Sequence, residues 1–185
     1  KKIIEIKRPN FIILYYHRVV KENNLYKETG PNIHLCVKEN EFKLQMKFIS
    51  ENFNLISLEE LYKCNFRCSK FSVAVTFDDG YLDNYEIAYP ILKEYKVPAT
   101  IFLVSKNFVS QPWAWWIELW NYLKKIQKIN FEGKEYVCLN NIQKEKAFFI
   151  LKDKIKKLNS DKQLTFIKQL TNDEIRENHQ SLFLK

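Results

Sequence analysis

The 185-residue sequence has little glycine and cysteine, and it contains no long apolar run. Only 3 residues are glycine, whereas 14 Phe, 10 Tyr and 4 Trp bring the aromatic share to 15%. This composition is typical of a folded chain with a sizeable core and excludes a disordered one. No stretch approaches the roughly 20 apolar residues that a membrane-spanning helix needs. We therefore expect a folded protein without a transmembrane segment.

The 4 cysteines are too few and too scattered for a disulfide framework. Cys64 and Cys68 have the spacing of half a zinc site, but no second close pair completes it. We interpret them as unpaired structural thiols, which favours a reducing compartment and hence the cytoplasm. The chain begins at Lys1 without a methionine, so we expect a preceding segment. A signal in that segment would instead direct the protein to the cell envelope or outside the cell.

The formal net charge of +8 is unevenly distributed along the chain. Residues 121–170 hold 12 Lys against 5 acidic residues, whereas residues 71–120 hold 3 Lys against 6 acidic residues. Many of the lysines fall on an expected amphipathic helix within 144–158. A solvated basic face is the favoured interpretation there, and a surface for an anionic polymer or lipid is the alternative. We expect no nucleic-acid partner, because the basic residues lie apart from the acidic motif described below.

The first part of the chain alternates between strand-like and helix-like patterns. Apolar runs predict strands at 11–16, 53–57, 71–77 and 99–104, and helical spacing predicts helices at 38–52, 57–61 and 83–96. The run at 11–16 is continuous enough for a strand buried on both faces. Ser57 and Glu60 have the spacing of a helix-capping box. Short connections between strands and helices predict parallel pairing with right-handed crossovers.

From Trp113 onward the pattern is mostly helical, with a small hairpin expected around Gly133. Thr171 and Glu174 again have capping-box spacing and would open a last helix. We therefore divide the chain into an α/β part, residues 1–112, and a mostly helical insertion or subdomain, residues 113–185. Four tryptophans open the second part, and we interpret them as core packing, with a sugar-binding platform as the alternative: Trp113, Trp115, Trp116 and Trp120.

An acidic pair, Asp78 and Asp79, directly follows the strand-like run VAVTF. In parallel α/β folds, functional sites gather at the carboxyl ends of strands. Gly80 permits a sharp turn, and Asp83 or Asn84 would cap the next helix. Two neighbouring carboxylates at a strand end can have separate roles: one binds a metal ion, and the other polarises a water molecule bound to that ion. Taken without their surroundings, Asp78, Asp79 and Gly80 also fit an ordinary turn that has no function.

The motif TFDDGYLDN, with ILYYHRV before it and VPATIFLV after it, resembles the polysaccharide deacetylase family, the NodB-homology domain of carbohydrate esterase family four. The resemblance covers residues 11 to about 120 and includes EFKLQMKFISENFNLISLEEL. The stretch PWAWWIEL is similar to a Trp-rich segment in members that carry a helical insertion. The resemblance implies an α/β fold, the N-terminal portion of a distorted (β/α) barrel with parallel strands, followed by the helical subdomain.

The resemblance also implies a function, the metal-dependent hydrolysis of N-acetyl groups on amino sugars of a polysaccharide or oligosaccharide. Asp78 matches the catalytic base of the family, and Asp79 matches the aspartate that binds the divalent metal, commonly zinc. His17 ends the first expected strand, so its side chain could face the same groove. A packed histidine that is hydrogen-bonded to the backbone is the alternative for this residue.

The sequence departs from the family in its later motifs. The His-Ser/Thr-x-x-His pair that completes the metal site is absent, as are the general-acid histidine and the arginine and aspartate motifs. The only histidine after the acidic pair is His179, and the residue four positions on is Phe183. We therefore interpret the chain as the N-terminal part of a deacetylase with an incomplete zinc site. A non-catalytic carbohydrate-binding or regulatory remnant is the alternative.

A third function, glycoside hydrolysis by two carboxylates, is disfavoured. Glycosidases hold their two carboxyl groups roughly 5 to 9 Å apart across the sugar. Adjacent residues on one turn, such as Asp78 and Asp79, rarely reach that separation with opposed faces.

Overall fold

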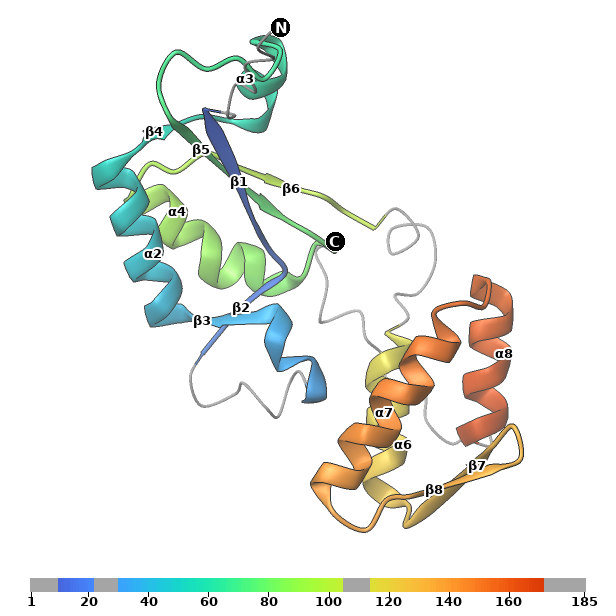
Figure 1. The fold of residues 1–185 in the computed structure, drawn as a ribbon. Helices are drawn as coiled ribbons and strands as arrows, with labels where there is room; N and C mark the ends of the chain where they lie inside the picture. The colour runs from blue at the N-terminus through green and yellow to red at the C-terminus, as the bar shows by residue number, and fades with distance from the viewer. Residues whose placement is uncertain (1–9, 22–29, 105–113, 172–185) are drawn as a thin grey trace, which may run out of the picture.

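The computed structural model describes residues 10–21, 30–104 and 114–171 (Figure 1). Its main sheet consists of four parallel strands: β1 (Phe11–Tyr16), β4 (Asn54–Leu55), β5 (Ser72–Phe77) and β6 (Ala99–Ile101). β5 lies in the centre, with β1 along its whole length on one edge and β4 and β6 sharing the other edge. The predicted parallel α/β arrangement is confirmed.

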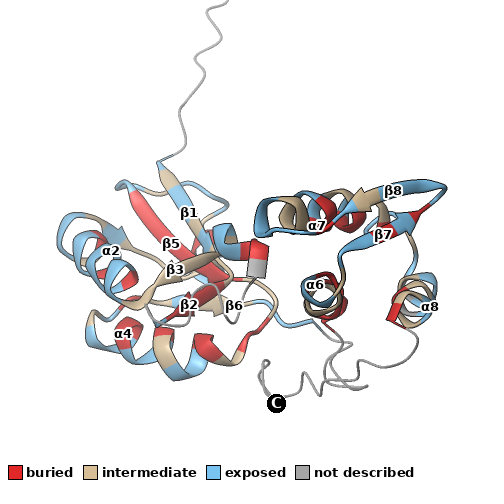
Figure 2. Cartoon of the chain, turned by 90° about the horizontal axis from the view of Figure 1, so that it is seen from below, coloured by how far each residue is buried: buried red, intermediate tan, exposed pale blue. Residues whose placement is uncertain are grey.

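β5 is the most deeply buried strand, because all six of its residues are buried (Figure 2). Its β-branched residues suit a pleated strand that is packed on its faces. One face joins a core formed with α2 (Glu39–Asn52) and α4 (Tyr89–Glu94), the helices that cover the sheet (Figure 1). This core contains Phe42, Met46, Ile49, Val73, Val75, Phe77, Ile91 and Leu92.

The predicted helices of the α/β part are present, with one local irregularity. Ser57 and Glu60 form the predicted capping box at the start of α3 (Leu58–Lys63). The helix after the acidic pair contains a π-helical turn, η3 (Asn84–Ala88), directly before α4. Pro90 has no backbone N–H to donate, and the adjacent wide turn lets the helix continue through it. The helix is therefore irregular at Pro90 but not broken.

β1 forms the predicted strand, but the expectation that it is buried on both faces was wrong. Ile12, Ile13 and Tyr15 are 43%, 39% and 71% exposed. The reason is that β1 lies at an edge of the sheet, and within the described residues no strand pairs with its outer side. A shallow apolar groove follows β1 and is lined also by Phe48 and Phe53. Apolar residues along an open edge are typical of a surface that another element covers.

The second part of the chain packs around a core of its own. It contains α6 (Trp115–Lys125), the antiparallel strands β7 (Lys128–Phe131) and β8 (Lys134–Val137), α7 (Asn141–Ile155) and α8 (Ser160–Thr171). Gly133 makes the predicted hairpin turn, with φ of +75°. The largest fully buried side chains of this core are Leu119, Leu123, Phe148, Leu151, Ile155 and Ile167. Between residues 114 and 171 no strand joins the main sheet, so the mostly helical character is confirmed.

Two expectations about this part fall outside the described residues. The boundary at 112/113 lies within 105–113, and it stays a prediction. The last helix was expected to begin near Thr171, which is instead the final residue of α8 and donates its hydroxyl to the Ile167 carbonyl oxygen. The other residues expected to form that helix lie within 172–185, outside the described residues. Among the helices described, none has both the length and the apolar character needed to cross a membrane.

Candidate functional site

The acidic pair lies at the predicted position, immediately past the carboxyl end of the central strand. The Asp78 backbone N–H donates to the Tyr16 carbonyl oxygen, so the ladder between β1 and β5 continues to this residue. Asp79 and Gly80 then turn the chain with positive φ values of 72° and 64°. Aspartate tolerates this left-handed region better than most residues. The positive φ favours glycine at position 80, where a Cβ atom would also require the Leu103 side chain, 2.5 Å away at Cδ2, to shift.

His17 lies beside the acidic pair because of the register between β1 and β5. Tyr16 is opposite Phe77, so the residues that follow the two strands, His17 and Asp78, are also neighbours. The His17 Nε2 atom is 4.0 Å from the Asp78 Oδ2 atom. Both side chains are partly accessible, with 20% exposed for His17 and 41% for Asp78. The sequence left open whether His17 faces the groove; the structure brings it to the acids, and its role stays a prediction.

Asp79 carries a half-buried carboxyl group for which no hydrogen-bond donor is found in the described part of the chain. Burial raises the pKa of this carboxyl above its ordinary value, because the charged form loses hydration. The neighbouring charge of Asp78 raises the pKa further, whereas His17 and Lys156 lower it. A cation bound at this point would relieve the unfavourable burial and the repulsion between the two acids.

We expect Asp79→Asn to stabilise the fold at neutral pH by roughly 0.5–2 kcal/mol, towards the lower end because solvent reaches the carboxyl group. The folded-state pKa of Asp79 is raised above 3.8. Between pH 3.8 and that folded-state pKa, the folded chain therefore binds more protons than the unfolded chain. The stability supplied by the protonated form is full below pH 3.8 and falls as the pH rises through the folded pKa. Asparagine also tolerates the positive φ.

Urea unfolding of the metal-free protein at pH 7 and pH 4 measures this effect. The advantage of Asp79→Asn should shrink at the lower pH, because a larger fraction of the wild-type carboxyl is then protonated. Glu86→Gln, at an exposed acid in the following helix, is the matched control. A variant that is less stable than the wild type at pH 7 would contradict the desolvation account.

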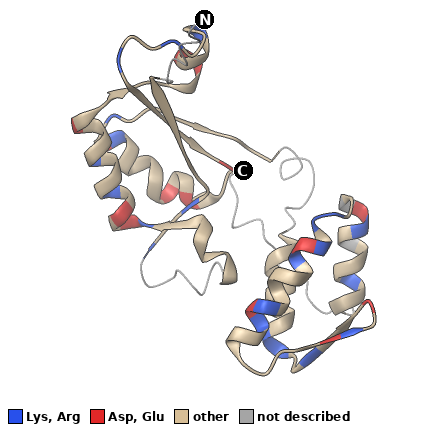
Figure 3. Cartoon of the chain, viewed as in Figure 1, with Lys and Arg blue, Asp and Glu red and all other residues tan. Residues whose placement is uncertain are grey.

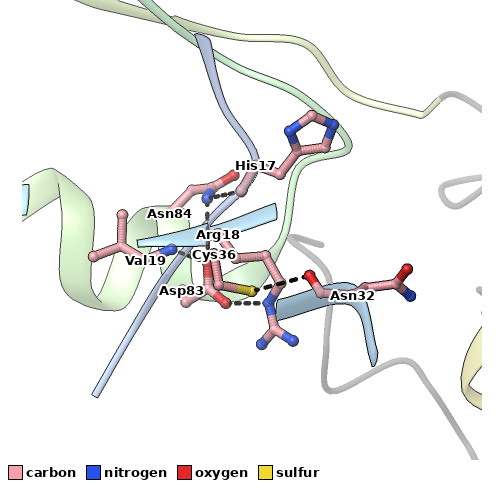
Figure 4. Close-up of polar contacts among 7 residues, drawn as sticks. All are labelled: His17, Arg18, Val19, Asn32, Cys36, Asp83 and Asn84. Atoms are coloured by element: carbon pink, nitrogen blue, oxygen red, sulfur yellow. Dashed lines mark hydrogen bonds and ion pairs between the residues drawn. The ribbon is translucent and has the colours of Figure 1, made fainter. Parts of the chain in front are cut away.

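Asp83 does not cap the following helix, which corrects the expectation from the sequence. Its backbone is already helical, and its carboxylate instead contacts the β2 strand (Arg18–Val20) (Figure 4). Arg18 Nε donates to Asp83 Oδ2 over 2.7 Å, and the Val19 N–H donates to Asp83 Oδ1 over 3.3 Å. Asn84 likewise donates to the His17 carbonyl oxygen over 2.8 Å. These bonds attach the motif to the segment that carries His17.

The Arg18–Asp83 pair is buried, with only 7% of each residue exposed. Burial alone would lower the pKa of Arg18, but the Asp83 charge and hydrogen bond outweigh it and raise the pKa. The Arg18 guanidinium also lies over the Tyr81 ring, 4.8 Å from its centre. Arg18 therefore stays charged, and its bond to Asp83 fixes the turn that contains the acidic pair.

We expect Asp83→Ala to lower the free energy of unfolding by about 3–5 kcal/mol, because it leaves the Arg18 charge buried without its partner. Equilibrium urea unfolding measures the loss. The control is Glu94→Ala, which breaks the exposed pair between Lys43 and Glu94 and should leave the midpoint unchanged. Equal midpoints for the two variants would show that the buried pair does not hold the turn.

A pocket of about 300 Å³ opens between the acidic end of the sheet and the helical part of the chain. The α/β side is formed by His17 and Asp79, with the short helix η2 (Gly30–Leu35) and strand β3 (Cys36–Lys38), which pairs with β2. The opposite side is formed by α6 and α7, which lie beyond the carboxyl end of the sheet (Figure 1). Its lining residues are His17, Arg18, Asn32, Leu35, Cys36, Asp79, Tyr81, Trp115, Trp116, Ile117, Lys152 and Lys156.

The tryptophans divide between the two interpretations. Trp115 and Trp120 are buried in the core of the helical part, as the packing interpretation expected. Trp116 is only partly buried and lines the pocket, packing also against Tyr81 in the turn after the acids. Trp113 lies outside the described residues. Among the described residues, Trp115 and Trp116 both line the pocket, and Trp116 is the less buried of the two.

The described residues do not form a complete metal site. Within them, no group of three or more His, Cys, Asp or Glu side chains is placed to hold an ion. Catalytic zinc usually has three protein ligands, which the acidic pair and His17 do not supply in this arrangement. Cys64 and Cys68 are free thiols with sulfur atoms 4.0 Å apart, and they gain no further ligand from the described residues. Any metal held by Asp79 requires ligands from elsewhere.

Two pocket residues were missed in the sequence, where the lysines of 144–158 were interpreted as a solvated face. Lys152 is in fact buried, and it reaches the pocket together with Lys156. Their spacing of four residues places them on one side of the C-terminal end of α7, a signal that was present in the sequence. What the sequence could not show is that this face lies opposite the acidic pair.

Known proteins resemble the chain over the same region. Residues 67–135 match the family model for polysaccharide deacetylases. The Bacillus subtilis (strain 168) protein YxkH, whose name assigns it to the polysaccharide deacetylases, is 35% identical over 99 residues, which are 51% of this chain and 32% of YxkH. A Staphylococcus aureus (strain N315) poly-β-1,6-N-acetyl-D-glucosamine N-deacetylase is 34% identical over 113 residues, covering 56% of this chain and 39% of the relative.

Among solved structures, the Streptococcus pyogenes deacetylase PplD in complex with acetate is 32% identical, with a TM-score of 0.42, covering 51% of this chain and 42% of PplD. IcaB from Ammonifex degensii is 20% identical, with a TM-score of 0.43, covering 77% of this chain and 51% of IcaB. The chain spans about a third to two fifths of the length of the curated relatives. With the acidic motif inside the matched region, this part of the chain resembles part of the NodB-homology domain of the polysaccharide deacetylases.

Proposed function

We propose that the full-length protein removes N-acetyl groups from amino sugars of a polysaccharide or oligosaccharide, and that this chain supplies the acidic pair. The observation that carries the proposal is the position of Asp78 and Asp79 at the end of the central strand. His17 is beside them, and Asp79 and His17 open onto a pocket. The similarity to polysaccharide deacetylases makes hydrolysis of an acetamide the reaction that best suits this arrangement.

Asp78 is the proposed general base. It would accept a proton from the water that attacks the acetamide carbonyl carbon. As the C–N bond of the adduct breaks, that proton would pass to the leaving nitrogen, which gives acetate and the free amine. Its carboxylate is accessible, with 41% of the side chain exposed, and its backbone is anchored by the hydrogen bond to Tyr16. His17 lies 4.0 Å away, so a small rotation of either side chain would bring the two into hydrogen-bond distance.

Asp79 is the proposed ligand of a divalent metal, with zinc as the expected ion. Its half-buried carboxyl is the group that a cation would favour most, because burial and Asp78 both oppose its charge. The described residues alone do not complete the site. We propose that the remaining ligands lie outside them. The expected cytoplasmic location likewise stays a prediction.

Acetate release by the full-length protein tests the proposed function. The substrates are chitin oligomers and β-1,6-linked N-acetylglucosamine oligomers, since the Staphylococcus aureus relatives are named for the second polymer. Enzyme-coupled acetate detection should report turnover on at least one of them, abolished by chelation and restored by zinc. Absence of acetate release from every N-acetylated substrate would overturn the proposal.

The carbohydrate-binding alternative has one observation in its favour, the partly buried Trp116 in the pocket wall. Aromatic side chains with an apolar body and a polar tip are suited to such surfaces. A protein of this kind would bind the oligomers without releasing acetate, so calorimetry beside the acetate assay separates the two functions.

A further inference from the structure

Two lysines at the C-terminal end of α7 reach the same pocket as the acidic pair. Lys152 lies in the last turn of α7, and Lys156 is the residue that caps it, four residues on and on the same side. Lys152 is 9% exposed, and its Nζ donates a 2.6 Å hydrogen bond to Asn32 Oδ1, itself a buried side chain of η2. Lys156 lies close enough to Asp79 to lower the pKa of that carboxyl. The helical part of the chain thus places the ammonium groups of Lys152 and Lys156 beside the proposed reaction site.

Neither lysine forms an ion pair within the described residues, and the charges of Asp79 and Asp153 act on them only at longer range. Among the residues that the structure describes, no carboxylate lies within ion-pair distance of Lys152 or Lys156. Other lysines of this part are paired, as Lys128 is with Glu135 over 3.0 Å and Lys154 with Glu132. Burial and the neighbouring Lys156 charge lower the pKa of Lys152. Buried charges are normally paired, so an unpaired cation at a pocket wall indicates a place for an anion.

The pocket has the size and the lining of a ligand site. Its volume of about 300 Å³ is at the lower end of the range for small-molecule pockets. Trp116 and Ile117 supply an apolar wall, and Arg18 is already neutralised by Asp83. The unpaired positive charge is therefore confined to the α7 side, where basic residues run along the helix (Figure 3).

We infer that Lys152 and Lys156 form an anion subsite beside the acidic pair, and that the substrate is an N-acetylated polysaccharide carrying a carboxylate or phosphate close to the reacting acetamide. The inference rests on the proposed function for the reaction, but not for the binding of the anion. Lysine acts as a point charge, so either anion would be accepted. The amide of Asn32 orients the Lys152 ammonium group.

Calorimetry with the full-length protein tests the subsite. The ligands are a hyaluronan tetrasaccharide for the carboxylate, N-acetylglucosamine 1-phosphate for the phosphate, and chitotetraose as the neutral comparison. We expect Lys156→Gln to weaken binding of at least one anionic ligand about tenfold, as expected for loss of one charge-assisted contact. Binding of chitotetraose should be unchanged. Lys156 is exposed, so this variant leaves the fold intact.

The matched control is Lys157→Gln, which removes the same charge from an exposed neighbour that does not line the pocket. Lys152→Gln is a second variant, with its folding checked by circular dichroism because its bond to Asn32 is lost. The subsite is refuted if both anionic ligands bind no tighter than chitotetraose, or if Lys156→Gln binds them like the wild type. Selective anion binding without any acetate release would instead refute the proposed function and leave the subsite standing.

Discussion

Asp78→Asn is expected to lower the kcat of acetate release by the full-length protein about 10²- to 10⁴-fold, the usual effect of removing a general base. Asparagine has nearly the same shape as aspartate, but its amide cannot accept the proton from the attacking water. The backbone bond from residue 78 to Tyr16 is unaffected, so the end of β5 should keep its geometry. Asp79 retains its carboxylate, and the zinc content should therefore be unchanged.

Acetate release and zinc content are measured on the same preparation, so that loss of the base and loss of the metal are separated. Glu86→Gln removes an exposed carboxylate from the next helix and should keep wild-type turnover. Activity of Asp78→Asn within about twofold of the wild type would exclude Asp78 as the base. His17, the next titratable group at the site, would then be the residue to replace.

The position of the acidic pair could be predicted because its signal is local. Six residues that suit a buried strand end in two carboxylates and a glycine, and the strand, the turn and the glycine each follow from neighbouring residues. The capping box at Ser57 and Glu60 and the turn at Gly133 were predictable for the same reason. His17 required one further step, the register that places β1 beside β5.

The errors concern features that depend on distant residues. The burial of β1 was overestimated, because whether a strand lies at an edge depends on its partners and not on its own sequence. Asp83 follows a turn at the usual capping distance, yet Arg18, 65 residues earlier, binds its carboxylate in a buried pair. Lys152 follows the pattern of a solvated face, but Asn32, 120 residues away, accepts its hydrogen bond. Long-range contacts of this kind leave no local signature.

Asp79→Ala is expected to remove the metal and the activity of the full-length protein together. Alanine offers no ligand, and unlike asparagine it is poorly suited to the positive φ of 72° at this position. Elemental analysis should find about one zinc per chain in the wild type and little in the variant. A variant that keeps its zinc but loses turnover would show that Asp79 is not a ligand.

The 185-residue chain by itself should bind zinc only weakly, because Asp79, with at most Asp78 or His17, falls short of the three protein ligands of a catalytic site. Zinc calorimetry and the acetate assay on the isolated chain test this. Tight stoichiometric binding with turnover would mean that the remaining ligands come from within the chain. His34 would then be the first candidate, since it is an exposed histidine on η2, the helix that also lines the pocket. His179, outside the described residues, would be the second, and His34→Ala beside His179→Ala would identify which of them completes the site.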